Sequence, residues 1–238
     1  MNSIVVELMS KMFTYNGKKL ETWNPFTGCH FDCSYCWARK LAEGKLKDCY
    51  RDGFNCEYHP DRINKRFKSD EFVFVCSMGD ISFAEDYVKN AIIDTIKKNQ
   101  QTKFLFCTKN PGMYQKFPDM DNCYYGATIE TNRTYPNTIS KAPDVKLRMA
   151  IMVSLEGVKK FLSIEPIMDF DLIEFSNWIY DINPDIVEIG ADNYNNNLPE
   201  PSSDKVLKLI DILTLHGVNV IQKQGLERLL SAIRCNKG

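Results

Sequence analysis

The sequence lacks long apolar runs, and its longest stretches of that kind are only a few residues in length. Because about 20 consecutive apolar residues are needed to cross a bilayer, we expect no membrane-spanning helix. The first residues, Met1 to Glu7, also lack the basic segment followed by an apolar one that marks a secretory signal. These absences predict a cytoplasmic protein with no membrane association.

The chain also has little net charge, since 30 Lys and Arg nearly balance 31 Asp and Glu. This balance excludes a uniformly basic binder of nucleic acids. A hydrophobic content of 44% with 12% aromatic residues excludes an intrinsically disordered chain. One local basic run, Arg62, Lys65, Arg66 and Lys68, is interpreted either as a phosphate-binding loop bordering the substrate entrance or as a solvated loop.

Short β-rich runs alternate with longer amphipathic stretches, and this alternation predicts the architecture. The expected strands are 21–26, 71–76, 103–107, 123–128, 161–164, 185–189 and 218–222, and the expected helices are 38–47, 84–99, 170–180, 204–216 and 226–233. Alternation of this kind implies βα units around a mostly parallel sheet. We therefore expect a single α/β domain over residues 1–238, a partial, TIM-like (β/α) barrel of six or seven strands.

Three of the nine cysteines, Cys29, Cys33 and Cys36, form a C-x3-C-x2-C loop (27–37) directly after the first expected strand. Three thiolates on one tight loop can bind three corners of a [4Fe–4S] cluster and leave one iron open for another molecule. The alternative is a structural zinc ion, which needs a fourth ligand. The candidates for that ligand are His30, His59, Cys49 and Cys56.

The loop resembles that of the radical S-adenosylmethionine (radical SAM) enzymes, including the aromatic Tyr35 before the last cysteine. The motifs Trp23 to Pro25, Thr108 to Pro111, Ser163 to Pro166 and Gln222 to Gly225 are also similar to a compact, phage-associated family of this kind. The resemblance implies that the open iron binds S-adenosylmethionine. It further implies that reductive cleavage gives a 5′-deoxyadenosyl radical, which abstracts a hydrogen atom from the substrate.

The resemblance also suggests cofactor-binding residues at the ends of the strands. It implies contacts from Tyr35 to the adenine, from Ser77, Gly79 and Asp80 to the methionine amino group, from Thr128 and Glu130 to the ribose, and from Arg148 to the cofactor carboxylate. Glu165 and Asp192 would serve the cofactor or the substrate. From the residues alone, Asp80 could instead cap a helix and Arg148 could be a solvated helix residue. Cys76 and Cys107 could either face the cavity or pack in the core.

The resemblance implies a one-electron donor such as flavodoxin or ferredoxin, and it leaves the reaction class open. A nucleotide or nucleic-acid base is the first substrate hypothesis, with a peptide or small amine second, and no obligate oligomer is expected. Two other classes of function stay open: a zinc-stabilised nucleic-acid-binding protein and an iron–sulfur redox sensor without catalysis.

Overall fold

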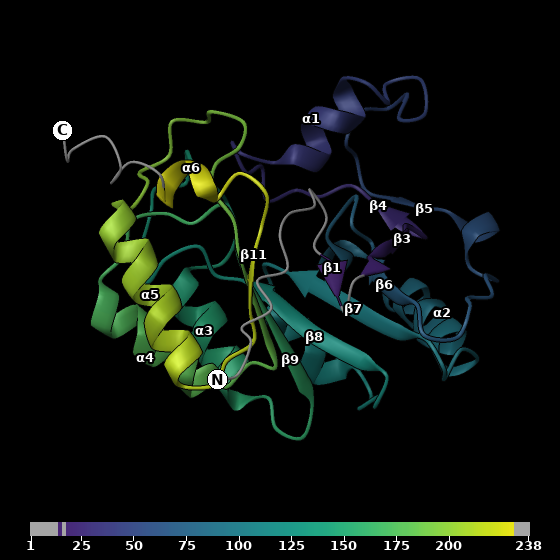
Figure 1. The fold of residues 1–238 in the computed structure, drawn as a ribbon. Helices are drawn as coiled ribbons and strands as arrows, with labels where there is room; N and C mark the ends of the chain where they lie inside the picture. The colour runs from purple at the N-terminus through teal and green to yellow at the C-terminus, as the bar shows by residue number, and fades with distance from the viewer. Residues whose placement is uncertain (1–13, 16–17, 231–238) are drawn as a thin grey trace.

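The computed structural model describes residues 14–15 and 18–230. Seven parallel strands form one sheet in the order β11-β10-β9-β8-β7-β6-β3, and the sheet curls into a half-barrel in a single α/β domain (Figure 1). The strands are β3 (Glu21–Trp23), β6 (Phe72–Val75), β7 (Lys103–Thr108), β8 (Cys123–Thr128), β9 (Lys159–Ile164), β10 (Ile186–Ile189) and β11 (Val220–Gln222). The predicted partial barrel is therefore confirmed.

Helices connect the strands and cover the outer face of the sheet. They are α1 (Trp37–Glu43), α2 (Asp86–Lys97), α3 (Val145–Ser154), α4 (Leu172–Ile182), α5 (Ser203–Leu215) and α6 (Glu227–Leu230), with short 3-10 helices η1 (Pro60–Arg62), η2 (Ile81–Phe83) and η3 (Pro111–Lys116). Side-chain caps begin four of these described helices. Cys36 caps α1 and Asp80 caps η2, while Asp144 accepts a hydrogen bond from the Lys146 N–H at α3 and Ser202 accepts one from the Lys205 N–H at α5. The end of the predicted last helix, 231–233, lies outside the described residues.

The main core lies between the outer face of the sheet and these helices. Phe104 and Phe106 of β7 pack there with Ile92 of α2 and Ile179 of α4. A second apolar cluster, which includes Leu105 and Phe161, lines the concave face. Because side chains alternate along a strand, each strand contributes one row to either face.

The concave face changes from apolar to polar toward the carboxyl ends of the strands. Leu105 is followed two residues later by Cys107, and Phe161 is followed by Ser163. On β10, Ile186 is followed in the same way by Glu188, which lies in register with Ser163. A polar layer therefore stands at the end of the half-barrel where ligands of parallel α/β folds bind.

Four short strands lie outside the main sheet. They are β1 (Thr14–Tyr15), β2 (Lys18–Lys19), β4 (Phe26–Thr27) and β5 (Glu57–Tyr58), and they pair antiparallel as β1-β2 and β4-β5. The predicted strand 21–26 is therefore wrong beyond Trp23, because Pro25 has no N–H for the sheet and the chain turns there to pair with β5.

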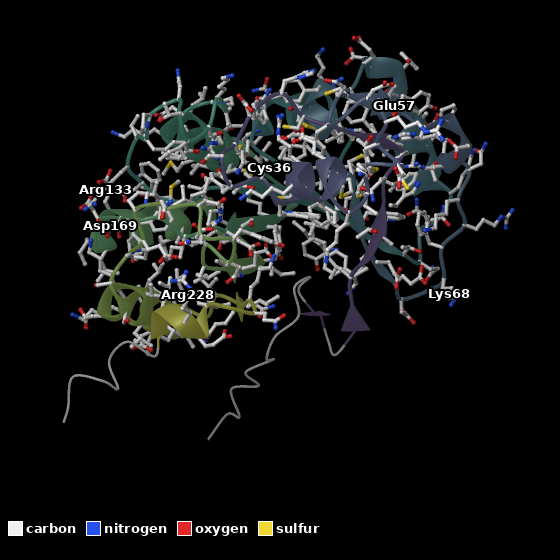
Figure 2. All side chains as sticks on the ribbon, turned by 90° about the horizontal axis from the view of Figure 1, so that it is seen from above. Cys36, Glu57, Lys68, Arg133, Asp169 and Arg228 are labelled. Carbon is white, nitrogen blue, oxygen red and sulfur yellow. The ribbon has the colours of Figure 1, made fainter. Side chains whose placement is uncertain are left out.

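The cysteine loop follows β4 and leads into α1, which lies beside the carboxyl ends of the strands (Figure 1). Viewed from above, Cys36 lies near the middle of the molecule, with Lys68 at one edge and Arg133 and Asp169 at the other (Figure 2). Within the described part of the chain, the helices are all too short or too polar to cross a membrane.

Candidate functional site

The three thiols of the cysteine loop share one apolar environment. Cys33 is buried and Cys29 and Cys36 are half-buried, and Phe31 packs against the same cluster of side chains. Burial raises the pKa of the Cys29 thiol, and negative charge on Asp80, Cys33 and Cys36 raises it further. The three thiols therefore lie within electrostatic range of one another.

Two glycines fix the start of this loop against the turn that follows β6. Gly28 and Gly79 form a parallel bridge, in which the Gly28 N–H donates to the Met78 carbonyl (2.9 Å) and the Asp80 N–H donates to the Gly28 carbonyl (3.0 Å). A Cβ on Gly79 would lie 2.6 Å from the Gly28 oxygen, so only glycine fits. The cysteine loop and the predicted methionine-binding turn are thus one hydrogen-bonded unit.

The turn itself is held by side chains from neighbouring strand ends. Asn24, just after β3, accepts hydrogen bonds from the Ser77 hydroxyl (3.1 Å) and the Met78 N–H (2.9 Å). Asp80 caps η2 through the Ser82 N–H (3.0 Å) and accepts from the Thr108 hydroxyl (2.7 Å). The capping role considered for Asp80 is therefore confirmed, and its role in cofactor binding stays a prediction.

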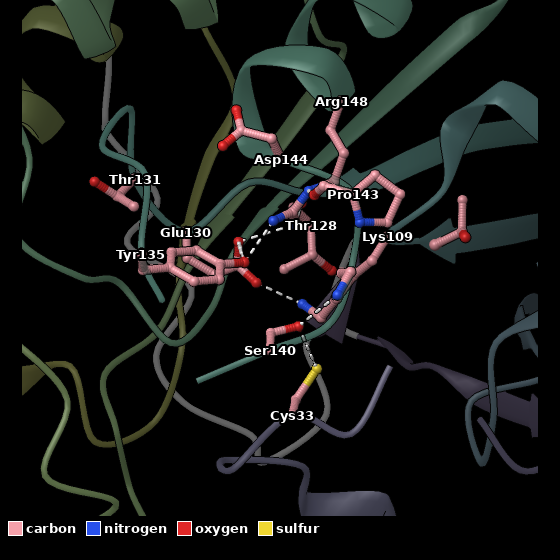
Figure 3. Close-up of polar contacts among 12 residues, drawn as sticks. Cys33, Lys109, Thr128, Glu130, Thr131, Tyr135, Ser140, Pro143, Asp144 and Arg148 are labelled. Atoms are coloured by element: carbon pink, nitrogen blue, oxygen red, sulfur yellow. Dashed lines mark hydrogen bonds and ion pairs between the residues drawn. The ribbon is translucent and has the colours of Figure 1, made fainter. Parts of the chain in front are cut away.

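A buried polar network joins the cysteine loop to the barrel wall (Figure 3). At its centre is Glu130, just after β8, whose side chain is 0% exposed. One carboxylate oxygen accepts from the Tyr35 hydroxyl and from the Lys109 ammonium (2.6 Å), and the other accepts from Arg148 (3.0 Å) and the Tyr135 hydroxyl (3.3 Å). The carboxylate is thus fully used within the protein, so a ribose contact would have to displace one of these partners.

Two buried cations keep this carboxylate ionised. Burial by itself would raise the pKa of Glu130, but the charges of Arg148 and Lys109 lower it to about 2. The expectation of a solvated Arg148 is wrong, because its side chain is 0% exposed and donates to the Thr128 and Pro143 carbonyls. Its contact with the cofactor carboxylate stays a prediction. Arg148 and Lys109 together outweigh the single negative charge of Glu130, so the network has a net charge of +1.

A second charged group lies on the concave face at the ends of β9, β10 and β11. Lys223 forms ion pairs with Glu165 and with Glu188 (3.5 Å), and the Ser163 hydroxyl donates to Glu188 (2.6 Å). The pKa of Glu165 is raised overall, because burial and the charge of Glu188 outweigh the lowering effect of Lys223. Gly190 leaves room for this group, since a Cβ there would lie 2.6 Å from a Glu165 oxygen.

Asp192 organises the loop after β10, and its role toward the cofactor or substrate stays a prediction. Its carboxylate accepts from the backbone N–H groups of Tyr194 (3.2 Å) and Asn196. Asn196 in turn accepts from Lys40 of α1, and Leu198 packs with the cysteine-loop residues. This loop therefore reaches across the mouth of the half-barrel to the helix that follows the cysteines.

The basic run does not form one surface at this mouth. The Lys68 carbonyl accepts a hydrogen bond from the Thr102 hydroxyl, just before β7 begins, and the Lys65 carbonyl accepts one from the Asn99 amide, just after α2 ends. These contacts lie at the amino ends of the strands, and Figure 2 shows Lys68 far from Cys36. The interpretation as a phosphate-binding border of the entrance is therefore wrong for Lys65 and Lys68.

The remaining cysteines and histidines occupy separate places. Cys76 is buried in the main core, as expected from core packing, whereas Cys107 lies on the concave face, 3.6 Å from the Thr128 hydroxyl. Of the possible zinc ligands, Cys49 is exposed and His59 contacts Thr27 (2.9 Å). His30 packs against Phe83, and Cys56 is half-buried. In the described residues, no three or more His, Cys, Asp or Glu side chains stand close enough together to hold one metal ion.

Sequence comparison identifies a family but not its chemistry. Residues 18–183 match the family described as "Protein of unknown function (DUF5131)". The chain belongs to this family. No curated protein matches the DUF5131 chain.

Solved structures show the fold to which the DUF5131 chain is similar. One is a spore photoproduct lyase complexed with dinucleoside spore photoproduct, with a TM-score of 0.53 and 13% identity over 81% of this chain. Another is SuiB of Streptococcus suis bound to the precursor peptide SuiA, with a TM-score of 0.54 and 11% identity over 86% of this chain. The chain spans 60% and 48% of these two proteins. It therefore shares the half-barrel fold of radical SAM enzymes.

Sequence reasoning missed several residues of the site. Lys109 and Lys223 lay in the motifs compared with the phage-associated family but received no role, and Tyr135, Ser140 and Glu188 were not considered. A usable signal existed for Lys109, because it directly follows β7 and Glu130 lies two residues after the neighbouring parallel β8. Residues just after adjacent parallel strands meet at one edge of the sheet.

Proposed function

We propose that this DUF5131 protein is a radical SAM enzyme that holds a [4Fe–4S] cluster through Cys29, Cys33 and Cys36. The observation that carries the proposal is that three thiols on one loop pack in the same apolar cluster and within electrostatic range of one another, beside the polar end of the half-barrel. Three thiolates without a fourth cysteine on the loop suit a cluster with one open iron. When bound and reduced, that cluster supplies the electron that cleaves S-adenosylmethionine to a 5′-deoxyadenosyl radical.

The neighbouring residues have distinct roles in this proposal. Ser77, Gly79 and Asp80 belong to the turn that binds the methionine amino group, and the hydrogen bonds of Met78 and Asp80 to Gly28 keep that turn beside the cluster loop. The Tyr35 ring packs against the adenine, while its hydroxyl is anchored by Glu130. Thr128, on the concave face, contacts the ribose.

Arg148 and Glu130 act mainly by placing other groups. Arg148 neutralises Glu130, and Glu130 fixes Tyr35 and the Lys109 ammonium. Lys109, 13% exposed in its side chain, is the network's cation nearest to solvent. We assign to it the carboxylate of the cofactor, the role that the sequence suggested for Arg148.

The substrate is proposed to enter over the concave face, where Glu165, Glu188 and Lys223 stand opposite the cysteine loop's network. Lys109 lies within electrostatic range of Glu165, so the two charged groups are neighbours. Carboxylates, an ammonium and a hydroxyl can together match the donor and acceptor groups on the edge of a nucleotide base. We therefore keep a nucleotide or nucleic-acid base as the substrate class. A flavodoxin or ferredoxin would supply the electron.

The first experiment measures metal and sulfide in anaerobically purified protein. Brown protein with about four iron and four sulfide per chain is expected. Replacing Cys29, Cys33 or Cys36 by Ala should remove most of the cluster, whereas Cys49→Ala should not, because Cys49 is exposed and outside the loop. Colourless protein with one zinc and no sulfide would contradict the proposal and favour the zinc-binding alternative. Cys235, another possible control, lies outside the described residues.

The second experiment tests cofactor cleavage. Protein reduced with dithionite should slowly convert S-adenosylmethionine to 5′-deoxyadenosine without substrate, and the product is measured by chromatography and mass spectrometry. The Cys33→Ala variant gives the background. A loaded cluster with no product above this background would show a redox-sensing protein instead of an enzyme.

A further inference from the structure

Ser140 touches one of the three cysteines from a distant part of the chain. Its hydroxyl oxygen lies 3.1 Å from the Cys33 sulfur, although the two residues are 107 positions apart in sequence. Both residues are buried. Ser140 lies in the segment between Glu130 and α3, which received no role in the proposed function (Figure 3).

The direction of this hydrogen bond follows from its other partner. The Ala142 N–H donates to the Ser140 oxygen (3.2 Å), which uses the hydroxyl as an acceptor. A cysteine that ligates iron is a thiolate and has no proton to give. The hydroxyl proton of Ser140 must therefore point to the Cys33 sulfur.

Each cysteine of the loop accepts at least one hydrogen bond, and the donor to Cys33 differs in kind from the others. Cys29 accepts from the Phe31 N–H (3.4 Å) and Cys36 from the Arg39 N–H (3.4 Å), which are backbone groups of the same loop and helix. Cys33 accepts from a side chain. The donor to Cys33 can therefore be removed by substitution without changing the backbone.

The segment around Ser140 is also held by contacts that do not involve its hydroxyl. On one side, the Ser34 N–H donates to the Ile139 carbonyl (2.9 Å), and on the other the Lys141 N–H donates to the Phe31 carbonyl (2.7 Å). Lys141 also forms an ion pair with Asp32 (2.7 Å). These contacts fasten the segment to the cysteine loop on both sides of Ser140.

We propose that Ser140 raises the reduction potential of the cluster by donating a hydrogen bond to the Cys33 thiolate. The proposal rests on the proposed function, because it requires the cluster. One electron from a low-potential donor of the flavodoxin or ferredoxin class adds one negative charge to the cluster, and no bond or proton changes at Ser140. A donor to a ligand sulfur stabilises that added charge, and such hydrogen bonds are among the factors that set cluster potentials.

The test compares Ser140→Ala with Ser34→Ala, which removes an exposed hydroxyl beside the same cysteine. Cluster-loaded proteins are titrated anaerobically, and the reduced cluster is followed by electron paramagnetic resonance. At a fixed potential, the ratio of reduced to oxidised cluster should fall about tenfold in Ser140→Ala, which is about 59 mV for one electron. The Ser34→Ala variant should match the wild type.

The outcomes separate this inference from the proposed function. A loaded Ser140→Ala protein with the wild-type potential would overturn the role of Ser140 and leave the cluster intact. Wild-type protein that binds no cluster would overturn both. If Ser140→Ala alone loses its cluster, electron–nuclear double resonance on the reduced wild type decides. One strong proton coupling should vanish after brief transfer to D2O, as expected of a hydroxyl on a ligand sulfur, and an unchanged spectrum would refute the proposal.

Discussion

Glu130 shows how a single buried carboxylate can organise a site. Its side chain is 0% exposed, yet it joins Tyr35 of the cysteine loop to Lys109 after β7 and Arg148 of α3. Burying a charged side chain costs free energy unless oppositely charged and hydrogen-bonding groups surround it. Removing one of these groups leaves a buried charge without a counter-ion. The site therefore depends on Glu130 for its assembly as well as for its charge.

Replacing Glu130 by Gln should destabilise the protein at neutral pH by about 3 to 5 kcal/mol, because Arg148 and Lys109 would lose their counter-ion. The pKa of Glu130 is lowered from 4.5 to about 2, so its ionisation stabilises the fold above pH 4.5. This contribution, on the order of 3 kcal/mol, is lost as the pH falls toward 2. Urea unfolding at several pH values measures it.

The difference between wild type and Glu130→Gln should therefore shrink between pH 4.5 and 2. The exposed Glu156→Gln serves as the control and should follow the wild type throughout. A difference that stays constant across this range would show that Glu130 is not the group that titrates.

Gly79 allows the turn after β6 to approach Gly28 closely, and any side chain at position 79 would prevent this approach. A Cβ would lie 2.6 Å from the Gly28 oxygen and 2.7 Å from its nitrogen, both backbone atoms that cannot move aside. Gly79→Ala should cost about 1 to 3 kcal/mol and reduce the iron retained per chain. Gly112→Ala is the matched control, because its Cβ would meet only ordinary contacts. Equal iron content in the two variants would show that the bridge does not hold the cysteine loop.

At the scale of elements, the loop after β10 packs against the cysteine loop and α1. Asp192 shapes it through backbone N–H groups, and Asn196 and Leu198 bring it to α1 and the cysteine loop. Such a loop limits access of solvent to the groups beneath it.

Asp192→Ala should loosen this loop and expose a bound cluster to oxygen. We expect visible absorbance of the cluster to bleach in air several times faster than in the wild type, as measured by stopped-flow spectroscopy. Asp211→Ala, an exposed acid on α5, should bleach at the wild-type rate. Equal rates for Asp192→Ala and wild type would argue against a covering role.

The sequence was informative about these elements where one pattern dominated. Strands such as Phe72–Val75 were predictable because they are apolar on consecutive residues, as strands covered on both faces are. Helix α3 has no such stripe, since the buried Arg148 interrupts its inner face. The meeting of Arg148 with Glu130 depends on how α3 packs, which a local pattern does not contain.

At the scale of the whole molecule, the cysteine loop is a junction between distant segments. Gly28 forms hydrogen bonds with the turn after β6, and Phe31 and Ser34 form hydrogen bonds with residues 139–141. The cysteine spacing predicted the loop. Its hydrogen-bond partners lie about 50 and 107 residues further along the chain, and the curl of the sheet brings them to the loop. A change that makes the cysteine loop more rigid should therefore also make these hydrogen-bonded segments more rigid.

Hydrogen exchange can test this coupling. Loading the cluster should raise amide protection in 28–36, 76–80 and 139–141 together, because a ligand that binds the folded loop stabilises whatever the loop is bonded to. The basic segment 60–70, whose Lys65 and Lys68 contact the amino ends of the strands, should change little. Protection confined to 28–36 would contradict the coupling.

Cys33 and Ser140 are 107 positions apart, and this separation also affects the order in which the site is synthesised. The cysteines leave the ribosome before Lys109, Glu130 and Ser140 have been made. Domains fold as units once their parts are available. The nascent thiols therefore stay without these partners until Ser140 has been made, and the proposed cluster would find its full surroundings only after that point.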